Sequence, residues 1–482
     1  MRESRAAPDR RRDVQPPEGS AEMGLLGHLG AILSRPVGTA DRARAALHVL
    51  DWIGCALAGA SQPAGRMLAA WAAEQGADGP ASAIGHGAAT AEAAAFVNGG
   101  LGNILEMDDL HRGSLLHAGD VVVPAALAAA EAGQTRGADL LTAVVLGYEV
   151  AIRIGLAAAS GGYSAWYNSS TCGVFGAAVA AAHARGAPGD DILRDTLGQA
   201  GMQAAGIWQC RLEPTDSKQL ATAHAARAGV CAAATAAAGF RGARAILEGE
   251  LGFLRAYYPD ADPLCVTAAP DAPWRIHEVS FKPWPACRHV HPAIAAALRV
   301  RDRVTLAEIE GIEVHSYGAG VAFCDAPAPA SDHAARFSFQ HCVAVALLRG
   351  APRVADFGAA ARADAAIAGL CRRITVREDA DLTAAFPGRM GAHVVIARTG
   401  ASPLKESVAS APGDPEDPLT VAQILAKFHA NAVTAGLDAA AADRLQEAVL
   451  GLPEAPGPGR LQAALRAASH RITNAIAEPE HV

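Results

Sequence analysis

Long alanine-rich segments in the first half of the sequence restrict what this chain can fold into. Hydrophobic residues make up 51% of the 482 residues and charged residues only 19%. Alanine is the best helix former and its small side chain lets helices approach closely, so these segments predict a tightly packed helical interior. Residues 174–185 before Gly186 and residues 222–238 before Gly239 are typical of such helices. The composition favours a compact chain over a disordered one.

The pattern changes near residues 259–273, where Pro, Asp and Ala cluster. Beyond this point, β-branched residues predict strands at 275–281, 309–316, 373–378 and 392–398, with helices at 292–300 and 342–348 among them. Helical periodicity returns at 420–435, 439–450 and 461–476. We therefore predict a mainly α protein. Its parts are a disordered tail (1–21), a helical domain (22–268 and 403–482) and a smaller α+β domain (269–402).

Charge and cysteine usage exclude several classes of function. Lys and Arg number 41 against 49 Asp and Glu, a net charge of −8, and no basic cluster follows the N-terminus, so nucleic-acid binding is not expected. The nine cysteines are scattered singly, which is typical of reduced thiols in a cytoplasmic protein. No secretory signal and no apolar run long enough to span a bilayer is found, so no membrane association is predicted. Nucleotide, flavin and serine-hydrolase motifs are also absent from the sequence.

The densest polar cluster of the helical half needs an explanation, because buried charge is costly unless it is paired or used. The cluster comprises Glu106, Asp108, Asp109, His111 and His117, with Asp120 shortly after. A metal site is one interpretation, although no familiar ligand spacing is present. A capped helix end with solvated acids is the alternative.

Lys218 stands in the first turn of a long apolar helix, where a cation is unfavourable beside the helix N-terminus. It should therefore have an anionic partner or a lowered pKa. The neutral amine would remove a proton, whereas the ammonium would hold a carboxylate. The alternative is a surface lysine that extends away from the helix.

Two further segments carry polar chemistry. The small residues 169–173 precede a predicted helix whose N-terminus is at Gly173. This helix N-terminus either binds an anion or is capped in the ordinary way. Tyr167 lies just before this segment. In the block 282–292, Arg288, His289 and His291 meet where a strand-like segment runs into a helix. Arginine suits carboxylate recognition and histidine suits proton transfer near neutral pH.

Ordered blocks between about residues 24 and 470 resemble the MmgE/PrpD family, which includes 2-methylcitrate dehydratase, cis-aconitate decarboxylase and iminodisuccinate epimerase. The blocks are 96–109, His117 with Pro124, 147–150, 171–178, 218–220, 282–291, 337–348 and 413–420. The resemblance implies a large helical domain with a smaller α+β domain, a homodimer, and no metal or organic cofactor. It also implies removal or addition of a proton on carbon next to a carboxylate, followed by loss of water or carbon dioxide or by return of the proton.

Several positions depart from the family pattern. Leu110 replaces a threonine, Tyr167 a histidine, Ala221 a histidine, and His341 stands where many members have tyrosine. Lys218 and His117 match the lysine and the histidine of the family pattern.

We predict a cofactor-independent lyase acting on a small di- or tricarboxylate. Lys218, His117, Tyr167, Asp108, His289 and His291 are the candidate catalytic residues, and Glu106, Asp109, Arg288, Gly173 and His341 the candidate substrate-binding residues. The acids of the cluster would orient His117, while Arg288 and the Gly173 helix end would anchor carboxylates. A dicarboxylate epimerase and a non-catalytic carboxylate-binding homodimer are the alternatives.

Overall fold

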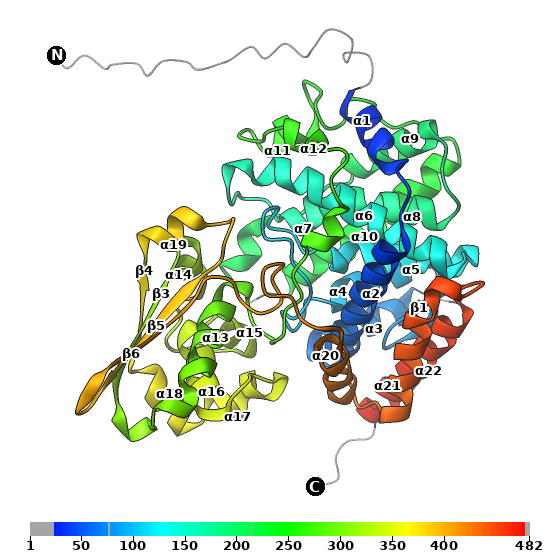
Figure 1. The fold of residues 1–482 in the computed structure, drawn as a ribbon. Helices are drawn as coiled ribbons and strands as arrows, with labels where there is room; N and C mark the ends of the chain where they lie inside the picture. Colours follow the sequence, from blue (N-terminus) through cyan, green and yellow to red (C-terminus); the bar gives the residue numbers. More distant parts are fainter. Residues whose placement is uncertain (1–23, 76–77, 214, 478–482) are drawn as a thin grey trace, which may run out of the picture.

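The computed structural model describes residues 24–75, 78–213 and 215–477, so the predicted tail at residues 1–21 lies outside the described residues. The fold is mainly α, as predicted, with one larger helical part and one smaller α+β part (Figure 1).

The helical part comprises α1 Gly24–Leu33, α2 Thr39–Ala60, α3 Pro63–Glu74, α4 Ala91–Leu101, α5 Gly119–Gly133, α6 Gly137–Ala158, α7 Asn168–Thr171, α8 Gly173–Ala184, α9 Asp190–Gly201, α10 Ser217–Ala237, α11 Phe253–Tyr257, α12 Leu264–Thr267, α20 Val421–Thr434, α21 Ala439–Leu450 and α22 Gly459–Ala477. The last helices return to the helical part, where α20 packs along α2. A short hairpin, β1 Ala81–Ala83 with β2 Gly87–Ala89, was not expected in this part.

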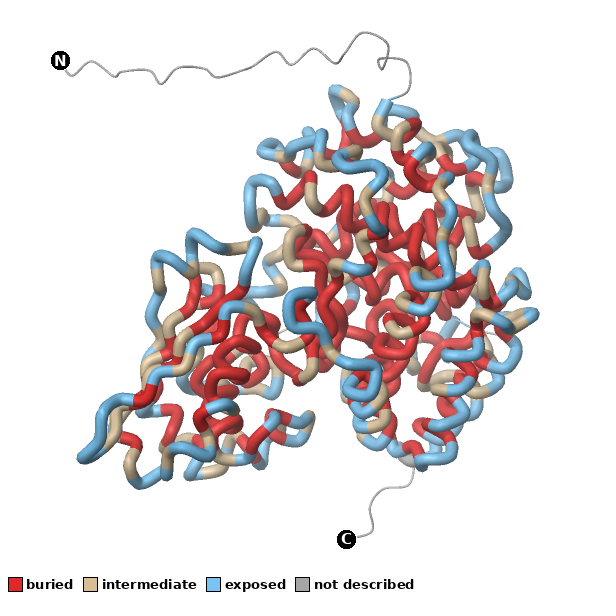
Figure 2. Tube along the Cα trace, viewed as in Figure 1, coloured by how far each residue is buried: buried red, intermediate tan, exposed pale blue. Residues whose placement is uncertain are grey.

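Close helix contacts explain the alanine bias. Helix α8 lies against α5, α6 and α10 in the interior, and Figure 2 shows this region as almost wholly buried. Gly147 of α6 and Gly176 of α8 meet so closely that a Cβ on Gly176 would lie 2.4 Å from the Gly147 carbonyl oxygen. Small residues at this crossing are therefore required for the helices to pack.

Helix α6 also has the length and hydropathy of a membrane span, over residues 137–161. However, 89% of its most apolar window is buried inside the protein, which is the position of a core helix.

The smaller part contains α13 His291–Val300, β3 Ile309–Ser316, α14 Gly318–Cys324, α15 Asp332–Arg336, α16 Phe339–Arg349, α17 Ala359–Arg362, α18 Ala365–Cys371, β4 Ile374–Glu378, α19 Ala380–Ala385, β5 Ala392–Arg398 and β6 Ala401–Val408. The sheet order is β4-β3-β5-β6, with β3 and β4 parallel and the other pairs antiparallel. Alternate residues of β3, including Ile312 and Val314, are buried, and α13 and α16 pack against the sheet.

Two strand predictions require correction. Residues 275–281 form a single 3-10 turn, Arg275–Glu278, because Ile276 and Phe281 bury their side chains in the helical core and form no ladder. Strand β6 was missed, since its sequence ASPLKESV has few β-branched residues, as an edge strand can. The sheet therefore continues to Val408, beyond the predicted domain limit at residue 402.

Candidate active site

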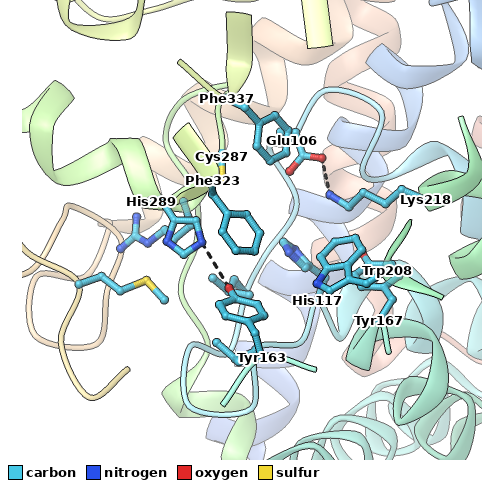
Figure 3. A pocket seen from close by; sticks show the side chains of 14 residues that line it. Glu106, His117, Tyr163, Tyr167, Trp208, Lys218, Cys287, His289, Phe323 and Phe337 are labelled. Atoms are coloured by element: carbon cyan, nitrogen blue, oxygen red, sulfur yellow. Dashed lines mark hydrogen bonds and ion pairs between the residues drawn. The ribbon is translucent and has the colours of Figure 1, made fainter. Parts of the chain in front are cut away.

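A cavity lies where the two parts meet, and side chains from both reach into it (Figure 3). It is lined by Glu106, Leu110, Leu115, His117, Tyr163, Tyr167, Trp208, Lys218, Cys287, Arg288, His289, Phe323, Phe337 and Met390. The structure thus brings together six predicted site residues from four separate segments of the chain.

The acidic loop, residues 102–118 between α4 and α5, supplies one wall. Two buried lysines hold its backbone: Lys282 Nζ donates to the Glu106 carbonyl at 3.0 Å, and Lys427 Nζ donates to the Met107 carbonyl at 2.7 Å. Glu106 itself has φ of 56°, a left-handed conformation that is unusual for a residue other than glycine. These contacts fix the direction in which Glu106 points.

Lys218, in the first turn of α10, pairs with Glu106. Both side chains are buried, with Lys218 only 6% exposed. Burial alone would lower the pKa of Lys218, but the Glu106 carboxylate raises it well above its usual value. Conversely, burial favours protonation of Glu106, yet Lys218 and Lys282 hold its pKa below the usual value. Of the two states predicted for Lys218, the structure therefore supports the ammonium with an anionic partner.

His117 is oriented by the acidic loop. Its Nδ1 pairs with the Asp108 carboxylate and lies 2.9 Å from the Asp109 carbonyl oxygen. Asp108 also accepts from Lys282 Nζ at 3.2 Å, and despite burial, His117 and Lys282 hold the pKa of Asp108 well below its usual value. With Nδ1 engaged in this way, Nε2 is the ring nitrogen left for the cavity.

Asp108, His117 and Asp120 bring their ligand atoms within 4.8 Å of one another, a spacing that would permit a metal ion. No donor among the described residues reaches either carboxylate oxygen of Asp120, and burial with the adjacent Asp108 raises the pKa of Asp120 well above its usual value. Three other buried acids nearby have lysine partners: Glu106 with Lys218, Asp108 with Lys282, and Asp51 with Lys427. A protonated Asp120 that donates to Asp108 adds no further negative charge to this cluster.

Asp109 turns away from the cavity. Its carboxylate lies 2.7 Å from His48 Nδ1 and accepts from Tyr148 Oη at 2.6 Å and from the Gly119 amide at 3.0 Å. These contacts tie the acidic loop to α2, α5 and α6. The predicted substrate-binding role of Asp109 is therefore corrected to a positioning role.

Arg288 and His289 enter from the α+β side. Arg288 lines the cavity but pairs with Asp414, and its buried Nε has no hydrogen-bond partner among the described residues. His289 Nδ1 lies 2.6 Å from Tyr317 Oη and its Nε2 lies 3.3 Å from Tyr163 Oη. Burial and nearby cations lower the pKa of His289 to about 3, so its imidazole is neutral.

Besides Asp108 and Asp109, three predicted residues do not line the cavity. His291 lies behind Arg288, where its Nε2 contacts the Ala286 carbonyl oxygen at 3.0 Å. His341 is a buried residue of α16, and its Nε2 contacts the Asp356 carbonyl oxygen at 2.8 Å. Gly173 is buried against Val121, with 2.6 Å between the Val121 side chain and a Cβ added at Gly173. The Gly173 helix end is thus filled by protein and does not present free amides to a ligand.

Tyr167 does line the cavity, and its ring stacks on Trp208 with 4.4 Å between centroids. Its buried Oη has no partner among the described residues, and burial raises the pKa of the phenol above its usual value. Tyr167 is therefore a protonated donor facing the site.

Sequence reasoning missed part of this site. Lys282 is the first residue of the block 282–292, but no role was predicted for it. A lysine in an apolar stretch indicates a buried acidic partner. Trp208, Tyr163 and Phe323 lie in segments without any polar motif, so no sequence signal marked them.

A cluster of ionisable side chains around a cavity between two domains is typical of proteins that act on small molecules by acid–base chemistry. Family models make the assignment specific: residues 36–265 match the MmgE/PrpD N-terminal domain and residues 284–453 match the MmgE/PrpD C-terminal domain. The chain belongs to the MmgE/PrpD family.

Curated relatives cover part of the chain. A cis-aconitate decarboxylase-like protein of Aspergillus oryzae is 29% identical over 284 residues, 55% of this chain and 58% of that protein. Cis-aconitate decarboxylase of Aspergillus terreus is 28% identical over 63% of this chain and 67% of its own length. The human cis-aconitate decarboxylase is 30% identical over 55% of this chain and 56% of its own length.

Proposed function

We propose that this protein is a lyase, a dehydratase or decarboxylase, that transfers a proton at a carbon next to a carboxylate of a small acid. The observation that carries the proposal is that two buried pairs, Lys218 with Glu106 and His117 with Asp108, open on one cavity. Family membership and the decarboxylase activity for which the curated relatives are named support the same class of reaction.

In this mechanism the Lys218 ammonium holds a substrate carboxylate and stabilises the negative charge that develops on it as the neighbouring carbon loses its proton. His117, oriented by Asp108, accepts that proton at Nε2. The C–H electron pair forms the new carbon–carbon double bond as the C–O bond breaks, and His117 returns the proton to the departing hydroxyl, which leaves as water. Tyr167 donates a hydrogen bond to the departing oxygen. In a decarboxylation, the bond between carbon and the departing carboxylate breaks, its electron pair stays on the carbon as carbon dioxide leaves, and protonated His117 donates a proton to that carbon.

An epimerase is the second candidate, because His289 and Tyr163 lie across the cavity from Lys218 (Figure 3). A donor and an acceptor on opposite sides of one carbon would allow a proton to be removed from one face and returned to the other.

We also propose a cytoplasmic homodimer that needs no metal or organic cofactor. The family resemblance supports these points, and the nine cysteines are free thiols, as a reducing compartment favours. Light scattering of the purified protein measures the oligomeric state.

Solvent-deuterium exchange into a panel of carboxylic acids, followed by NMR, tests the function. Exchange with loss of water or carbon dioxide supports a lyase, exchange alone supports an epimerase, and binding without exchange supports a non-catalytic protein. His117→Asn should abolish exchange, whereas His470→Gln, an exposed histidine on α22, is the matched control and should retain it. Exchange that survives His117→Asn would contradict the assignment of the base.

A further inference from the structure

The reacting groups occupy only the inner end of a longer space. The inner cavity measures about 50 Å³, whereas an adjoining cavity of about 590 Å³, the vestibule, shares Trp208, Lys218, Phe323 and Phe337 with it. Most of a substrate beyond its reacting end must therefore lie in the vestibule.

The walls of both spaces are largely apolar. Leu110, Leu115, Tyr163 and Met390 line the inner cavity, and Leu212 and Ala322 add to the vestibule. Tyr163 and Phe323 have ring centroids 4.9 Å apart, so the aromatic wall is continuous on the α+β side. Such a surface gains free energy by contact with an apolar group and gives none to a carboxylate.

The cations of the site have little capacity for a polyanion. Lys218 is paired with Glu106, Lys282 with Asp108, and Arg288 with Asp414. Arg211 stands in the vestibule 3.9 Å over the Phe323 ring, and no acidic partner of this guanidinium is found among the described residues. Besides Lys218, Arg211 is therefore the one arginine or lysine among the described residues that line the vestibule, and a third substrate carboxylate would be desolvated here without a cation to receive it.

We propose that the substrate is a carboxylic acid with a single carboxylate at the reacting end and an aromatic or alkyl group that fills the vestibule, and not a tricarboxylate. This inference rests on the proposed function for the identity of the reacting end. The acid head would lie between Lys218 and His117, and the apolar group would extend outward past Trp208, Phe323 and Phe337.

Two 3-hydroxy acids test the proposal: 3-hydroxy-3-phenylpropanoate and citrate. Both have a CH2 next to a carboxylate and a hydroxyl on the following carbon, and loss of water gives cinnamate or aconitate. Calorimetric titration of the full chain should show the phenyl acid binding roughly tenfold or more tightly than citrate, the usual effect of one apolar group in a matching pocket. Equal or weaker binding of the phenyl acid, including no binding, would overturn the proposal.

Variants locate the binding. Phe323→Ala should reduce the preference for the phenyl acid over citrate about tenfold. Leu212→Asp should also reduce this preference, and Leu212 is 67% exposed, so the fold tolerates the change. Leu251 is 94% exposed and lies outside both cavities, so Leu251→Ala is the control and should leave the preference unchanged. A preference unchanged by both vestibule variants would place the phenyl acid elsewhere and overturn the proposal.

The reaction is scored separately from binding, by ultraviolet absorbance of cinnamate or aconitate and by deuterium exchange. If the phenyl acid binds selectively but neither acid reacts or exchanges, the substrate class stands and the lyase proposal fails. If citrate binds more tightly and loses water in a Lys218-dependent reaction, the lyase proposal stands and this inference fails.

Discussion

Replacing Lys218 with methionine separates the electrostatic role of the lysine from its packing. The change keeps most of the side-chain volume but leaves the buried Glu106 carboxylate without its main partner. Removing one member of a buried ion pair costs about 3–5 kcal/mol. Lys282 Nζ lies 3.9 Å from the other Glu106 oxygen and remains in place. We therefore expect the free energy of unfolding to fall by about 3 kcal/mol, the lower end of this range.

A second substitution in the same chain, Glu106→Gln, removes the negative charge that Lys218→Met leaves without its main partner. The double variant should recover about 2 kcal/mol of the loss, because a neutral amide is less costly to bury than an unpaired carboxylate. Turnover should fall by about 100-fold or more in both variants, since neither has the ammonium that stabilises developing charge.

Urea titrations at pH 5.5 and 7.5 and the exchange assay measure these effects. In the wild type the pKa of Glu106 is lowered, so its contribution to stability is present above its usual value of 4.5 and is lost as the pH falls through the folded-state pKa. In Lys218→Met, burial should raise that pKa, so stability should instead increase as the pH falls from 7.5 to 5.5. Wild-type stability and turnover in Lys218→Met, or a double variant less stable than the single one, would refute this account of the pair.

Three further changes probe other buried groups. Tyr167→Phe should lower turnover by about 100-fold, because the phenol no longer donates a hydrogen bond to the departing oxygen, whereas a near-silent change would remove Tyr167 from the mechanism. Asp120→Asn mimics the protonated acid and should leave melting temperature and turnover nearly unchanged, also after dialysis against EDTA; activity that EDTA removes and one divalent ion restores would instead indicate a metal at Asp108, His117 and Asp120. Burial raises the pKa of Glu131 from 4.5 to about 7, so its contribution to stability is complete below pH 4.5 and is lost as the pH rises through 7. This corresponds to roughly 3 kcal/mol, and Glu131→Gln should flatten the fall in melting temperature between about pH 5 and 8.

Local signals predicted the helices α8, α10, α13, α16, α20, α21 and α22 and three of the four strands of the larger sheet, β3, β4 and β5. Alanine has a high helix propensity, and alanine-rich segments form α8 and α10. β-branched residues favour strands, and they recur in β3, β4 and β5. The segment 275–281 shows the limit of such signals, because its apolar residues serve a helical core and not a sheet.

Helix propensity, ordered motifs and costly buried charges are visible along the chain, so the amino-acid sequence predicts the fold class, the family and the presence of a charged cluster. Which members of that cluster face one another depends on the tertiary structure. It placed Lys218 beside Glu106, 112 residues away in the sequence, turned Asp109 toward His48, and buried Gly173, His291 and His341 away from the cavity. The physical reason is that a side chain's pKa, partner and exposure depend on groups brought together by packing, and packing is not local in sequence.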